Sequence, residues 1–125
     1  LFGVEMALTV TGFTSSALAY KIVHESNASD AVSADVLGGA GTLWAIDANQ
    51  QTAAIAYLKI KITTGTVTVG TTQPDLMFEI PSSGAVMINL PAGLAFDQLS
   101  FWVTDAAAYD DTGDPGTVLL TFLCS

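Results

Sequence analysis

Apolar and polar residues alternate along much of the chain, and the clearest example lies within residues 53–81. In Leu58-Lys59-Ile60-Lys61-Ile62, the alternation places the three apolar side chains on one face of a pleated strand and both lysines on the other. Leu76-Met77-Phe78-Glu79-Ile80 repeats this period and ends at Pro81, because proline cannot donate to a sheet ladder. We predict a hairpin-like pair that buries Leu58, Ile60 and Ile62, while both lysines reach solvent or an acidic partner.

Seven further segments have strand-like patterns and are separated by turn residues. They are residues 4–10, 17–24, 31–37, 42–48, 85–90, 98–104 and 117–124. Residues 31–37 also fit a short helix, but we favour a strand. Residues 25–30 and 49–52 are expected to be connections, and Pro91 is expected to end the strand before it. Residues 98–104 are expected to form a central strand.

Alternation also predicts which side chains share a face in three of these strands. Residues 42–48 should place Leu43, Ala45 and Asp47 opposite Trp44, Ile46 and Ala48. Residues 98–104 should place Leu99, Phe101 and Val103 opposite Ser100, Trp102 and Thr104. Residues 117–124 should place Val118, Leu120 and Phe122 on one face, with Leu119 and Leu123 making the other face apolar too. This last strand is therefore expected to need two partners: its own second sheet and another protein surface.

Short strands at nearly regular spacing, with connections too short for crossover helices, predict an all-β fold. The expected architecture is one antiparallel β-sandwich of about eight strands over residues 1–125, with a jelly-roll-like arrangement. A chain of 125 residues is long enough for a single core.

Composition narrows the function classes. Twelve acidic residues against three Lys and Arg give a net charge of −9, which argues against nucleic-acid binding because phosphates need clustered cations. No apolar run is long enough for a membrane-spanning helix, so a soluble protein with no membrane partner is expected. Half of the residues are hydrophobic and 12% are charged, so some apolar surface is expected to lie at contacts between subunits of a homo-oligomer.

Few residues offer catalytic chemistry. His24 is the only histidine and Cys124 the only cysteine, so neither a serine-type triad, a histidine-rich zinc site nor an internal disulfide is expected. His24 is interpreted as a solvated residue at a strand end, and Cys124 as a small buried hydrophobe. We therefore predict no enzyme activity, no catalytic or cofactor-binding residues and no cofactor.

Two groups of residues suggest binding. Asp105, Asp110, Asp111 and Asp114 offer the oxygen ligands that calcium prefers, but their spacing does not match a known calcium loop, and we predict no structural metal there. Five aromatic residues could instead form a sugar platform, although core or interface positions are the commoner use of aromatics in strands. They are Tyr57, Phe96, Phe101, Trp102 and Tyr109. A carbohydrate-binding module therefore stays open as an alternative.

Several motifs occur in a distinctive order. Ala56-Tyr57-Leu58-Lys59-Ile60-Lys61 leads through Thr68-Val69-Gly70-Thr71-Thr72-Gln73-Pro74 to Leu76-Met77-Phe78-Glu79-Ile80-Pro81. Gly93-Leu94-Ala95-Phe96 and Phe101-Trp102-Val103-Thr104 follow. Over residues 42–123 this order resembles that of small tailed-phage virion proteins of β-sandwich type.

The resemblance implies a structural role in the virion without catalysis. Capsid decoration, by contacts with the major capsid protein or other virion proteins, is the first expectation, and a tail or fibre component is the alternative. The resemblance also favours a trimer over other homo-oligomers.

Overall fold

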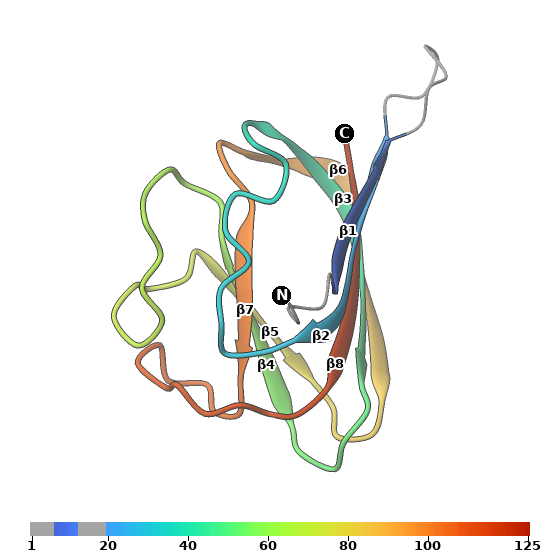
Figure 1. Cartoon of the computed structure of the whole chain (residues 1–125). Helices are drawn as coiled ribbons and strands as arrows, with labels where there is room; N and C mark the ends of the chain where they lie inside the picture. The colour runs from blue at the N-terminus through green and yellow to red at the C-terminus, as the bar shows by residue number, and fades with distance from the viewer. Residues whose placement is uncertain (1–6, 13–19) are drawn as a thin grey trace.

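The computed structural model describes residues 7–12 and 20–125, and all its regular structure is β (Figure 1). Its strands are β1 (Leu8–Gly12), β2 (Lys21–Ala28), β3 (Gly41–Gln50), β4 (Ala56–Lys61), β5 (Leu76–Ile80), β6 (Ala85–Phe96), β7 (Ser100–Thr104) and β8 (Val118–Cys124). The strands form a five-stranded sheet in the order β1-β2-β8-β3-β6 and a three-stranded sheet in the order β5-β4-β7, and neighbouring strands are antiparallel. The predicted antiparallel β-sandwich is confirmed.

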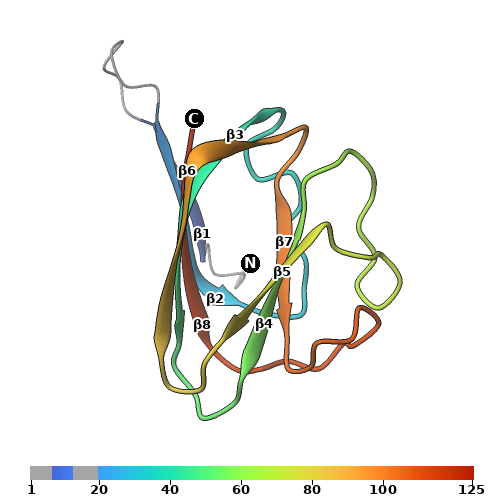
Figure 2. The same ribbon diagram turned by 180° about the vertical axis from the view of Figure 1, so that it is seen from behind.

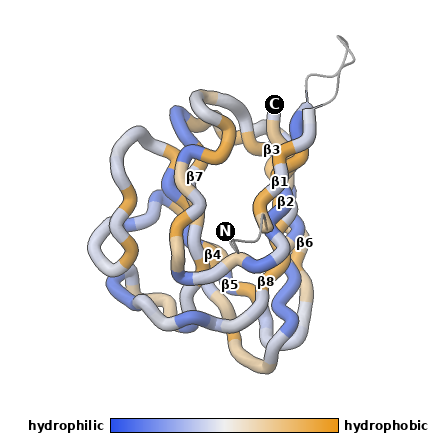
Figure 3. Tube along the Cα trace, viewed as in Figure 1, coloured by the Kyte–Doolittle hydropathy of each residue, from blue (hydrophilic) through white to orange (hydrophobic). Residues whose placement is uncertain are grey.

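The core lies between the two sheets, which face each other in Figures 1 and 2. Hydrophobic positions alternate with pale and polar ones along the strands (Figure 3), so each strand turns one set of side chains inward. In β8, Val118, Leu120 and Phe122 are fully buried, and Leu119 and Leu123 face outward, so the two groups lie on opposite faces as predicted. Phe122 packs against Phe101 of β7 with ring centroids 4.6 Å apart, which joins the two sheets.

The strand pairs are nested along the chain. β4 pairs with β5, β3 with β6 and β2 with β8. A further pairing comes between these last two pairs in the nested order. The segment 29–36, which follows β2, lies beside β7, which precedes β8, and an isolated bridge joins Ser33 to Phe101. This nesting of innermost and outer pairs is the arrangement of a jelly roll, with β1 added at one end of the larger sheet.

The chain passes from one sheet to the other directly after β2. Residues 25–28, expected in a connection, belong to β2, and the segment 29–36 then bonds to the free edge of β7. Ser33 N–H donates to the Phe101 carbonyl at 2.8 Å, and Val36 N–H donates to the Leu99 carbonyl at 2.9 Å. β7 is therefore the last named strand of its sheet, which corrects its expected central position, and this segment covers its edge.

A bulge in β3 changes the predicted alternation. Opposite β8, Leu43 pairs with Cys124 and Ala45 pairs with Leu123, so Trp44 is an extra residue. Leu43, Ile46 and Ala48 are fully buried, whereas Trp44 and Ala45 are only partly buried. Relative to Leu43, the bulge moves residues 45–48 to the faces opposite those expected from strict alternation.

On the other side of the bulge, β6 continues through Pro91 to Phe96 instead of ending at the proline. β6 is an edge strand, where a residue without an N–H is tolerated. The predicted end of this strand at Pro91 is therefore wrong, and the described strand is twice as long as expected.

The predicted β4–β5 pair is confirmed. Leu58 and Ile60 are fully buried, and Ile62 is partly buried against the core. Lys61 forms an ion pair with Asp75, with Nζ and Oδ1 3.7 Å apart. Asp75 also closes the β4–β5 loop, because its Oδ2 accepts bonds from Ile62 N–H at 2.8 Å and from Thr63 N–H at 3.2 Å.

We predict that Asp75→Ala lowers the free energy of unfolding by about 1–2 kcal/mol, because two backbone donors lose a charged acceptor. Burial acts to raise the pKa of Asp75, but bonds from Ile62 and Thr63 and the charge of Lys61 outweigh it and lower the pKa below its ordinary value. The stabilisation is therefore present above the ordinary carboxyl pKa and is lost as the pH falls through the lowered value. Urea unfolding at pH 7 and pH 3 measures this effect. The difference in the free energy of unfolding between wild type and variant should be smaller at pH 3, and an equal difference at both pH values would contradict the prediction.

Parts of the predicted strands 4–10 and 17–24 lie outside the described residues. Within the described part, β1 extends to Gly12 and β2 begins at Lys21. No helix in the part of the chain that the structure describes is long and apolar enough to cross a membrane.

Candidate interaction surface

The outer side of the five-stranded sheet, which we call the open face, has no described segment lying over it in Figures 1 and 2. Its outward residues come from all five strands. They are Thr9 and Thr11 of β1, Ile22, His24 and Ser26 of β2, Leu119, Thr121 and Leu123 of β8, Trp44, Ala45, Asp47 and Asn49 of β3, and Met87 and Asn89 of β6. Small polar and aliphatic side chains predominate, so the face offers hydrophobic contact with few charges to desolvate.

The strand register sets these side chains in rows across the open face. In the middle row, Thr9, His24, Thr121, Asp47 and Met87 lie side by side on consecutive strands. His24 Nδ1 lies 3.0 Å from the hydroxyl oxygen of Thr121. His24 is thus a partly buried residue within a strand, not the solvated strand-end residue expected from the sequence.

Trp44 adds an aromatic group to the open face and is not among the five aromatic residues considered as a sugar platform. Its indole N–H donates to the Ser125 hydroxyl at 2.9 Å, and its ring meets Tyr20 edge to face with centroids 6.4 Å apart. Gly93, with φ of 74°, packs so closely that an added Cβ would lie 3.0 Å from the indole ring. A bulge that redirects a large side chain could not be read from the regular alternation around it.

The acidic residues are distributed unevenly. Among the described residues, Asp47 is the single acidic residue on the open face. Six others lie on the outer side of the three-stranded sheet or in the loops beyond it, which we call the acidic face. They are Asp75, Glu79, Asp105, Asp110, Asp111 and Asp114. The sandwich therefore has one nearly uncharged face and one strongly acidic face.

Lys59 lies beneath the acidic face and corrects a prediction. Its side chain is 0% exposed, and its Nζ donates to the Ala108 carbonyl at 2.5 Å. Burial lowers the pKa of Lys59, while Asp111, Asp110 and Asp105 act to raise it. Lys59 therefore does not reach solvent, because the loop after β7 covers it. Trp102, its neighbour across the β4–β7 pair, is also buried, and its indole N–H has no partner among the described residues.

The acidic loop over Lys59 is organised by its own hydrogen bonds. Asp111 Oδ2 accepts from Ala106 N–H at 3.1 Å and from Gly113 N–H at 3.3 Å. A hydrogen bond between the Asp105 and Asp111 side chains raises the pKa of Asp105. Asp111 is thus used to hold the loop, and no group of three potential metal ligands was found among the described residues. That this loop binds no structural metal stays a prediction.

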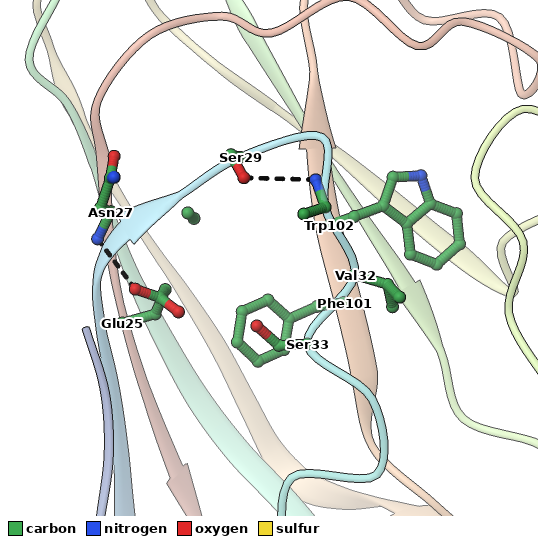
Figure 4. A pocket seen from close by; sticks show the side chains of 9 residues that line it. Glu25, Asn27, Ser29, Val32, Ser33, Phe101 and Trp102 are labelled. Atoms are coloured by element: carbon green, nitrogen blue, oxygen red, sulfur yellow. Dashed lines mark hydrogen bonds between the residues drawn. The ribbon is translucent and has the colours of Figure 1, made fainter. Parts of the chain in front are cut away.

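A cavity of about 130 Å³ lies between the sheets near the end of β2 (Figure 4). The Phe101 side chain points into it, whereas the indole of Trp102 points to the other side of β7. Glu25 is 7% exposed, and its Oε1 accepts from Asn27 N–H at 2.9 Å. The described lining residues hold one carboxylate and no histidine or cysteine, so they do not provide the paired acid and base of a hydrolase.

The other candidate residues are separated from one another. Cys124 is fully buried, and burial raises the pKa of its thiol to about 11, so it is a poor nucleophile at neutral pH. Phe96, Phe101 and Trp102 are buried, while Tyr109 is 45% exposed in the acidic loop. The five aromatic residues considered as a sugar platform therefore do not form one exposed surface.

Comparison with known proteins gave no relative. No protein-family model matches the chain, and neither the curated proteins nor the solved structures include a significant match.

Proposed function

We propose that this chain is a structural protein of a tailed-phage virion that acts through protein–protein contacts, with capsid decoration as its role. A tail or fibre component is the alternative position in the particle. The proposal includes self-association into a homo-oligomer and contact with the major capsid protein or another virion protein. The number of copies is not fixed by this proposal, although the resemblance favours a trimer.

The observation that supports this proposal best is the open face. It is broad, carries aliphatic side chains such as Ile22, Leu119 and Leu123, and includes His24 and Asp47 as its titratable groups. These three aliphatic side chains are partly exposed and Met87 is 57% exposed, and apolar side chains among small polar ones with few charges are typical of protein contacts. The fold agrees with the proposal, since jelly rolls occur in viral capsids, although they occur in lectins as well and a fold alone does not define a function.

A carbohydrate-binding module is the second candidate, and the Trp44–Tyr20 pair favours it. Aromatic rings on an exposed sheet can stack on sugar rings, with Asp47 and Asn89 as nearby polar groups. Titration with oligosaccharides, followed by tryptophan fluorescence, separates the two candidates. A structural virion protein should bind assembled particles and leave the fluorescence unchanged on addition of free sugars.

Mass spectrometry of purified phage particles is the direct test of the proposed role. Many copies per particle would support decoration, and a few copies would support a tail or vertex position. Absence of the chain from particles would contradict the proposal.

We also predict that Leu119→Lys weakens self-association and particle binding at least tenfold, because it places a charge within a desolvated apolar contact. Leu119 faces outward on β8, so the domain should keep its fold. Light scattering on the isolated protein and cosedimentation with particles measure the two effects. A wild-type monomer at high concentration, together with unchanged particle binding by the variant, would refute the assignment of this face as a contact.

A further inference from the structure

The charge distribution restricts how two copies of the chain can meet. A net charge of −9 makes two copies repel each other, and six of the described carboxylates lie on the acidic face. Contact through the acidic face would bring these carboxylates together. Contact through the open face brings together surfaces that each carry one histidine and one aspartate.

The size of the open face suits a specific contact. Five strands spaced about 4.8 Å apart give a width of about 24 Å, and the seven residues of β8 give a length of about 23 Å. Two such faces in contact would bury on the order of 1,100 Å² in total, which exceeds the roughly 1,000 Å² expected of a specific interface.

The order of the strands makes the open face complementary to itself. β8 lies between β2 and β3, and Thr121 of β8 lies opposite His24 on one side and Asp47 on the other. A two-fold axis parallel to β8 and passing over Thr121 exchanges these two sides. His24 of one copy then lies across from Asp47 of the other copy, and the same pair forms a second time.

The next row of side chains fits the same axis. Leu123 of β8 lies opposite Ile22 on β2 and opposite Ala45 on β3. The axis therefore places the large Ile22 of one copy against the small Ala45 of the other, and each Leu123 against its counterpart. Large side chains facing small ones allow two sheet faces to pack closely.

We propose that two copies of this chain pair open face to open face about an axis along β8, with His24 of each copy against Asp47 of the other. The proposal rests on the proposed self-association and gives it a surface and a symmetry. It replaces the trimer with a two-fold pair as the basic unit, because an isologous contact of one face with itself closes at two copies.

The test is sedimentation equilibrium of the wild type and four variants, each checked for unchanged thermal unfolding. His24→Asp places like charges together at both pairs and should raise the dissociation constant at least about tenfold. His24→Asp combined with Asp47→Lys restores opposite charges and should return the constant toward the wild-type value. Thr121→Arg places two guanidinium groups at the axis and should give a monomer.

Met77→Lys is the matched control. Met77 is 44% exposed on the acidic face, so this substitution should leave the dimer unchanged. A wild-type monomer or trimer would overturn the proposal, and so would a double variant that associates no better than His24→Asp alone. These results are independent of particle composition: a monomer that is abundant in virions would refute this pairing alone, whereas a dimer absent from virions would refute the proposed virion role alone.

Discussion

Ile60→Asp is expected to unfold the domain. Ile60 is 0% exposed and lies in β4 between Leu76 of β5 and Phe101 of β7. An unpaired carboxylate at this position costs several kcal/mol, which is comparable with the roughly 5–15 kcal/mol that stabilises a domain. Circular dichroism and thermal unfolding should show loss of the cooperative transition.

The matched control is Met77→Asp on the adjacent strand. It introduces the same group on the outer face, where Met77 is already 44% exposed, and it should change the free energy of unfolding by less than about 1 kcal/mol. A folded Ile60→Asp variant with wild-type thermal stability would contradict the assignment of Ile60 to the core.

Lys59→Ala is expected to have the second largest effect, a loss of about 2–4 kcal/mol in the free energy of unfolding. The substitution empties the space of a fully buried side chain and leaves the Ala108 carbonyl without its donor. It also removes a cation that interacts electrostatically with Asp111, Asp110 and Asp105. The loop after β7 should therefore become more sensitive to limited proteolysis.

Two further variants separate packing from charge at this position. Lys59→Met keeps most of the buried volume, so it should lose less stability than Lys59→Ala, while the loop should still become more sensitive to protease. Lys59→Gln should cost about 1–2 kcal/mol because the shorter side chain leaves the Ala108 carbonyl unpaired, whereas a substitution at the solvent-exposed position expected for this lysine would have been nearly silent. Urea unfolding curves of all three variants that superimpose on the wild-type curve would show that the loop does not depend on Lys59.

Local alternation was sufficient to predict much of the fold. It identified β4, β5, β7 and β8 to within two residues, the inward face of β4, and the side chains that share a face in β7 and β8. Alternation works there because each of these strands keeps a strict period of two between a core and an outer face. The sandwich class followed from the spacing of such strands and the short connections between them.

The features that alternation missed depend on residues distant in the sequence. Lys59 is on the outer face of its strand as predicted, but it is buried because a loop some fifty residues later in the chain bonds to it. The residues after Trp44 change faces relative to Leu43 because the partner strand β8 has one residue fewer at that point. The open face became visible only when strands from both ends of the described chain were placed side by side.

The nested pairing also determines when this protein can fold. β4 and β5 are close in sequence and can associate early, whereas β2 and β8 are separated by nearly the whole described chain and must close a long loop. During synthesis, the larger sheet consists of two separate pairs, β1–β2 and β3–β6, until β8 leaves the ribosome and joins them. Until then each pair exposes an unbonded edge, so the nascent chain is expected to be most prone to aggregation just before β8 emerges.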